Sequence, residues 1–279
     1  MMSQPDVVYD LDIPDEIKGL LKSRLLSYHY DIDEIYTSFR DYFNQQFNKE
    51  HLRGTSAPIL DVGDLNSAFQ MIREKEIRTA GIDFPILLRK GSGRPVLMVC
   101  AMDPYRADEG QLPDTKLSYW VPFSIIKNPE KEKKYTEKEN LVFFHGLLNQ
   151  YDLYVTDVFK VFYREGHSTG NSQPEYTSLP IHKEILMNEI KIVKPDAILT
   201  LGNNARNAIC KILDLNVPKW SDTIYATRST AGLQVIMVPH ISGAANGAKS
   251  KILKNDDYRH IDGTGNSKYA SIILHEIKA

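Results

Sequence analysis

Four short apolar runs, separated by segments with helical spacing, constrain what this chain can fold into. The runs cover residues 95–100, 152–158, 195–202 and 233–238, and polar or small residues follow each. A short apolar run with a polar break is typical of a buried strand. Helical spacing marks residues 137–150, 181–193, 203–213 and 266–277, and an edge strand is expected near 223–228. Strands that alternate with helices in this way predict a parallel, doubly wound sheet.

The first 94 residues have a different pattern. Helical spacing predicts helices within 14–49 and over 66–80, with a loop between them at 51–64. One aromatic stripe on the early helices is typical of a core: Ile32, Ile35, Tyr36, Phe39, Tyr42, Phe43 and Phe47. We therefore expect an α/β protein in which residues 95–279 form a three-layer α/β/α domain around a central, mostly parallel four-stranded sheet. Residues 1–94 are expected to form a helical N-terminal extension packed on that core.

Composition narrows the class of protein. The 279 residues are 42% hydrophobic and 25% charged, as in ordinary soluble proteins, and no apolar run approaches the ~20 residues of a bilayer span. The N-terminus lacks the basic start and apolar core of a signal peptide. Two cysteines suit a reducing compartment and are too few for a structural zinc site or an iron–sulfur cluster. We expect a cytoplasmic protein with no metal, no cofactor and no membrane contact.

The charge distribution limits the partners. A net charge of −2 argues against strong non-specific binding of polyanions. Residues 1–90 carry 11 basic and 15 acidic side chains, so the N-terminal part is the acidic one. Any nucleic-acid face has to be local, and the acidic, aromatic N-terminal region is a candidate surface for a protein partner.

Candidate functional residues follow the four strands. They are Asp103, then Thr156 or Asp157, then Gly202, Asn203 and Asn204, and finally His240, Ser242 and Gly243. A parallel sheet gathers the carboxyl ends of its strands at one edge, where ligands bind in open α/β folds. Taken alone, Asp103-Pro104 is more typical of a turn, and Gly202 of a strand-to-helix turn, than of a functional site. Together they predict one carboxylate, one imidazole, one hydrogen-bonding pair and glycine turns around a common crevice.

These motifs, in this order, resemble the uracil-DNA glycosylase superfamily. The family's Gln-Asp-Pro-Tyr-His run after a strand is matched by Met102-Asp103-Pro104-Tyr105-Arg106, and its later Phe-Ser pair by Phe123-Ser124. The segment Leu201–Ala205 resembles its strand–glycine–helix motif, and His240–Ala244 resembles its closing His-Pro-Ser-Pro-Leu loop. The resemblance covers residues 95–275.

The resemblance implies hydrolysis of an N-glycosidic bond in DNA, with the target base flipped into a pocket. Asp103 would stabilise the sugar cation and position water, and His240 would stabilise the departing base as a neutral hydrogen-bond donor. Met102, Tyr105, Phe123, Thr156 and Asp157 would contact the base. Gly202, Asn203, Ser242, Gly243 and Lys249 would contact the nucleic-acid backbone. Tyr105 and Phe123 are equally typical of core aromatics, and Lys249 of a solvated lysine cluster.

Departures from the family pattern keep two other functions open. Thr156 or Asp157 stands where the family has an asparagine, and Asp157 would suit an exocyclic amine because it only accepts hydrogen bonds. The stretch Ala244–Gly247 stands where the family has a leucine wedge. One alternative is a non-catalytic protein that binds a nucleobase or nucleic acid on the same fold. The other is a hydrolase of small nucleosides or nucleotides.

Overall fold

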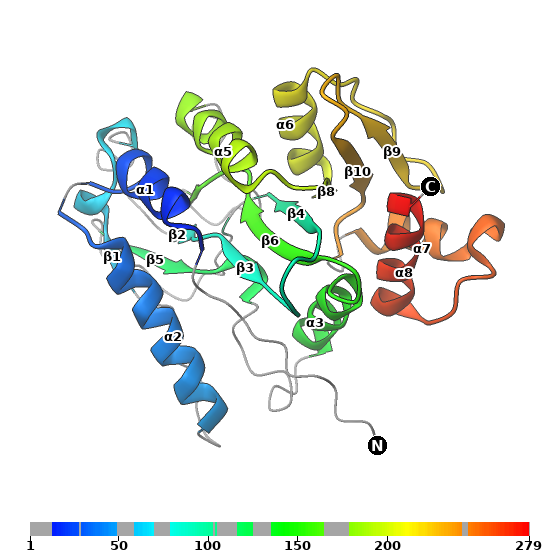
Figure 1. The fold of residues 1–279 in the computed structure, drawn as a ribbon, viewed down its shortest axis with the longest axis horizontal. Helices are drawn as coiled ribbons and strands as arrows, with labels where there is room; N and C mark the ends of the chain where they lie inside the picture. Colours follow the sequence, from blue (N-terminus) through cyan, green and yellow to red (C-terminus); the bar gives the residue numbers. More distant parts are fainter. Residues whose placement is uncertain are drawn as a thin grey trace.

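The computed structural model describes residues 13–27, 29–48, 59–69, 79–102, 104, 116–124, 135–164, 179–241 and 245–278. They form an α/β protein with two sheets, flanked by helices (Figure 1). The α-helices are α1 (Asp15–Arg24), α2 (Ile32–Asn48), α3 (Tyr135–Leu147), α5 (Pro180–Val193), α6 (Asn203–Leu213), α7 (Asn246–Lys254) and α8 (Gly265–Lys278). Within these ranges, no helix has both the length and the hydropathy needed to cross a bilayer.

The larger sheet has six strands. Their order is β3 (Ile86–Leu88), β6 (Asp152–Asp157), β4 (Val96–Ala101), β8 (Ala197–Leu201), β10 (Gln234–Val238) and β9 (Tyr225–Arg228). The four strands predicted from the apolar runs lie together and parallel at its centre, and β3 and β9 pair antiparallel at the two edges. The predicted number of four strands is therefore wrong. The three-residue β3 is too short to stand out as a pattern, and the predicted edge strand near 223–228 joins this same sheet as β9.

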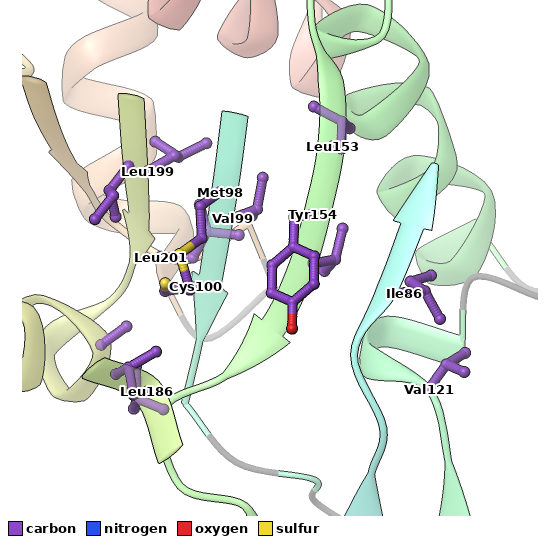
Figure 2. Close-up of a cluster of buried hydrophobic side chains, with 14 of the residues drawn as sticks. Ile86, Met98, Val99, Cys100, Val121, Leu153, Tyr154, Leu186, Leu199 and Leu201 are labelled. Atoms are coloured by element: carbon purple, nitrogen blue, oxygen red, sulfur yellow. The ribbon is translucent and has the colours of Figure 1, made fainter. Parts of the chain in front are cut away.

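Burial on both faces explains the apolar runs of the central strands. Every residue of β6, β8 and β10 is buried. Helices α5 and α6 lie over one face of the sheet, and α3 and α8 lie over the other (Figure 1). Figure 2 shows part of the resulting core, in which side chains of β4, β6 and β8 gather with Leu186 of α5. A parallel sheet covered on both sides needs this nearly continuous apolar sequence.

A second sheet was not predicted. It has four strands in the order β1 (Ile59–Asp61), β5 (Lys116–Trp120), β2 (Thr79–Asp83) and β7 (Val161–Arg164). The chain passes directly from β2 of this sheet to β3 of the larger sheet, and from β6 of the larger sheet to β7 of this one. These two chain segments therefore connect the two sheets. The predicted helix over 66–80 is wrong at both described ends, because residues 67–69 form a 3-10 turn and Thr79 begins β2; residues 70–78 lie outside the described ones. The partners of β2 are β5 and β7, which lie far away in the sequence and leave no trace in the local spacing.

The segment before residue 95 is not only helical, since it supplies β1, β2 and β3. Its predicted aromatic core is confirmed for Ile32, Ile35, Tyr36 and Phe39, which are buried, while the side chains of 42–48 lie outside the described ones. The Phe39 ring packs 5.8 Å from the Trp120 ring of β5, and the Tyr36 hydroxyl donates to the Pro85 carbonyl oxygen over 2.8 Å. These contacts join α2 to the second sheet. The domain boundary at residue 94 and the partner-binding role of this segment stay predictions.

Candidate functional site

The carboxyl ends of the four parallel strands lie at one edge of the larger sheet. Ala101 of β4 is paired with Asp157 of β6, and Val238 of β10 with Leu201 of β8. The residues at or directly after the ends of these strands therefore lie at the same edge of the sheet: Met102, Asp157, Gly202 and His240. Asp103, Tyr105, Ser242 and Gly243, which are also predicted site residues, lie outside the described residues. Their roles stay predictions.

His240 and Phe123 meet face to face at this edge. Their ring centroids are 5.6 Å apart and the ring planes are inclined by only 19°. Phe123 belongs to a short 3-10 turn, η3 (Pro122–Ser124), and its φ of 58° lies in the left-handed region, which a bulky side chain rarely adopts. Its other neighbour is Phe144 of α3, whose ring centroid is 5.1 Å away. Strained backbone of this kind persists only where the surroundings hold it, and it is common at functional sites.

His240 is held in its neutral form. Burial, and to a lesser degree the positive charge of Lys249, lowers the pKa of His240 to about 4. The Lys249 ammonium lies close by because it donates to the Ile241 carbonyl oxygen (3.1 Å) and to Asn266 Oδ1 (3.0 Å). At neutral pH the imidazole therefore has one N–H donor and one acceptor nitrogen. A neutral donor in a largely buried position can stabilise a developing anion without carrying a charge itself.

Lys249 differs from the other lysines of α7. Its ammonium is engaged inside the protein, whereas Lys251 and Lys254 are exposed. The position of Lys249 therefore supports an electrostatic effect on His240 more directly than the predicted contact with a nucleic-acid backbone.

Gly202 links the end of β8 to α6 beside His240. Its φ of 90° is a backbone conformation that favours glycine, whereas a Cβ on this residue would lie 3.4 Å from the Cβ of His240, an ordinary contact distance. The Gly202 N–H donates to the Val238 carbonyl oxygen over 2.8 Å, which fixes the start of α6 beside the end of β10. The next two residues are engaged as well. Asn203 Oδ1 accepts from the indole N–H of Trp220, and the Asn204 amide donates to the Met102 sulfur over 2.8 Å.

The structure separates Thr156 from Asp157, the two residues predicted as alternatives for reading the base. Thr156 is fully buried, donates to Glu189 Oε1 of α5 (3.0 Å) and accepts from Lys160 Nζ (2.7 Å). Because side chains alternate along a strand, Asp157 lies on the face of β6 that points away from Glu189 and α5. Helix α3 lies on that side of the sheet (Figure 1), and η3 contacts both β6 and α3. Asp157 is therefore the member of the pair on the side of Phe123.

A buried ion pair behind the site was not expected from the sequence. Lys160 Nζ lies 2.6 Å from Glu189 Oε2, and both side chains are fully buried. The Tyr154 hydroxyl also donates to Glu189, over 3.0 Å, and the Lys160 backbone N–H donates to His182 Nδ1 over 2.9 Å. The only hint in the sequence is a charged residue within each of two apolar segments, Phe159–Phe162 and Ile185–Ile190.

This ion pair anchors the turn that follows β6. The Val158 N–H donates to the Ala101 carbonyl oxygen (3.1 Å), and the Phe159 N–H donates to the Met102 carbonyl oxygen (3.0 Å). The turn thus joins α5, through Lys160, to the end of β4 at Ala101 and to Met102, which directly precedes Asp103 in the sequence. We infer that the ion pair supports the backbone of the candidate site from behind.

No protein-family model matches this chain, and no curated protein matches its sequence. The function of this protein is therefore inferred from the residues of the site and from their geometry.

Proposed function

We propose that this protein is a uracil-DNA glycosylase-like enzyme with the three-layer α/β/α arrangement of that superfamily. It would hydrolyse the N-glycosidic bond of a damaged or deaminated base in DNA, as in base excision repair. The observation that carries the proposal is the neutral, largely buried His240 stacked against Phe123 at the carboxyl edge of the parallel strands. An aromatic ring and a neutral N–H donor are what a flipped base requires for stacking and for stabilisation as it leaves.

The proposed reaction assigns one role to each group. Water adds its oxygen to C1′ of the deoxyribose while the bond from C1′ to the base nitrogen breaks. The Asp103 carboxylate stabilises the positive charge on the sugar and orients the water, whose surplus proton passes to solvent once its oxygen is bonded to C1′. The base departs with the electron pair of the broken bond, the His240 N–H stabilises its negative charge, and the released base takes up a proton from solvent. Asp157, on the Phe123 side of β6, is the candidate for reading the edge of the base.

The test is release of bases from defined DNA. Single strands and duplexes carrying uracil, hypoxanthine or an alkylated base are incubated with the protein, and free base is measured by mass spectrometry. We expect release of at least one of these bases. Replacing His240 by Ala or Asp103 by Asn should lower the rate by about 10²–10³-fold. The exposed His260→Ala is the matched control and should leave the rate unchanged.

The other outcomes distinguish the alternatives. If every substrate is left intact while an oligonucleotide still binds, the protein is a binding module on this fold. If free nucleosides are cleaved and compete with DNA, it is a nucleoside hydrolase. If base is released but His240→Ala retains the wild-type rate, the assigned mechanism is wrong.

A further inference from the structure

The coil after α6 returns along that helix and brings Trp220 to the site edge. Arg206 of α6 holds the coil by donating to the Pro218 carbonyl oxygen over 2.9 Å. The indole N–H of Trp220 then donates to Asn203 Oδ1, in the first turn of the same helix. Asn203 directly follows Gly202, which lies so near His240 that a Cβ added to it would be 3.4 Å from the His240 Cβ. Trp220 therefore lies beside the candidate site, although some twenty residues of chain separate it from either Gly202 or His240.

The orientation of the Trp220 ring is set by its surroundings. The Arg206 guanidinium carbon lies 4.3 Å from the centroid of the indole, and Arg206 itself is only 9% exposed. One face of the ring thus packs on a fixed cation, and the N–H edge is held by Asn203. Trp220 nevertheless remains partly exposed to solvent, whereas the other tryptophan of the chain, Trp120, is buried.

We propose that Trp220 is a stacking platform for a nucleobase next to the one held at His240. This inference rests on the proposed function and deepens it, because it specifies the ligand as an extended single strand instead of a free nucleoside. A preoriented indole suits this role because every base has a face that can stack, whatever the sequence. Lys219, directly before Trp220, is exposed, and the exposed Lys254 lies at the end of α7, which meets the same coil where Asn255 Nδ2 donates to the Asp222 carbonyl oxygen over 3.1 Å. These two ammonium groups are the candidates for contacting the phosphates. Asp222, Asp256 and Asp257 are also exposed near this surface and would limit its affinity.

The fluorescence of Trp220 tests this directly. Trp120→Phe leaves Trp220 as the only tryptophan, because the chain has two. Titration of this variant with a ten-residue oligothymidine should quench its emission in a saturable way, and thymidine alone should quench it far less. In the wild-type background, Trp220→Ala should weaken oligothymidine binding by about tenfold to a hundredfold. Trp220→Phe, the matched control, keeps a stacking ring and should retain most of the affinity.

Two results would overturn the inference. One is absence of oligothymidine binding by the wild-type protein. The other is binding with unchanged Trp220 emission and equal affinity of Trp220→Ala, which would make Trp220 a packing residue only. Failure of this inference can be told apart from failure of the proposed glycosylase activity. Base release that is unaffected by Trp220→Ala would leave the glycosylase standing, whereas quenching without base release would leave only the strand-binding surface.

Discussion

Replacing Lys160 and Glu189, singly and together, tests whether the ion pair behind the candidate site holds this part of the fold. Both side chains are fully buried, with 2.6 Å between Lys160 Nζ and Glu189 Oε2. Glu189 Oε1 also accepts from the hydroxyls of Tyr154 and Thr156, each over 3.0 Å. Removing one of the two charges leaves the other buried without an opposite charge. We therefore expect Lys160→Met and Glu189→Gln each to lower the free energy of unfolding by about 3–5 kcal/mol.

The double variant provides the decisive measurement. Lys160→Met with Glu189→Gln leaves no unpaired charge. The double variant should therefore lose less free energy of unfolding than the two single variants lose in sum. We expect a coupling energy of about 2–3 kcal/mol from the double-mutant cycle. Urea unfolding at pH 7, followed by far-UV circular dichroism, measures all four proteins. Amide exchange at Val158 and Phe159 should also quicken in the single variants, since the turn loses its anchor.

The exposed pair between Arg259 and Asp256 is the matched control. Its atoms are 2.7 Å apart, but the two side chains are 77% and 72% exposed, so Arg259→Met should cost less than about 1 kcal/mol. An additive cycle at Lys160 and Glu189, with coupling below about 0.5 kcal/mol, would refute the reasoning. So would single variants that are as mild as the control.

Two further predictions concern His240 and the packing of α3 on α8. The unfolded chain binds a proton at His240 below its ordinary pKa of 6.5, while the native protein does so only near 4. Stability should therefore be unaffected above pH 6.5 and fall by up to about 3 kcal/mol as the pH drops to 4. Urea unfolding between pH 6.5 and pH 4 should show that the stability of His240→Asn depends less on pH than that of the wild-type protein. An NMR titration that puts the His240 pKa near 6.5 would contradict this prediction. Separately, a Cβ on Gly146 of α3 would lie 2.6 Å from the Cβ of Ala270 of α8, so Gly146→Ala should cost about 1–3 kcal/mol and Ala270→Gly should restore part of it. Exposed Gly19 of α1 has open space around it, so Gly19→Ala in the same unfolding assay should instead stabilise by up to about 1 kcal/mol; equal effects at the two glycines would be evidence against close packing of α3 on α8.

The sequence was sufficient for the parts of the fold whose signal is local. The four central strands are buried on both faces, and this requirement leaves continuous apolar runs that can be recognised without the structure. The strand order was not needed to expect Asp157, Gly202 and His240 near one another, because parallel strands end at a common edge. The second sheet left no such signal. Its strand β2 takes both its partners from distant segments, 116–120 and 161–164.

Within the candidate site, the residue types came from the sequence, and their states came from the tertiary structure. A histidine after a strand ordinarily titrates near neutral pH, and its burial, together with the nearby Lys249 ammonium, lowers the pKa of His240 to about 4. Thr156 and Asp157 are adjacent in sequence, and only the packing of α5 decides that Thr156 faces Glu189 and that Asp157 faces the side of Phe123. Apolar periodicity is a property of neighbouring residues and can be predicted. Desolvation, ion pairing and the choice of face depend on segments that meet only when the chain has folded, so the structure alone decides them.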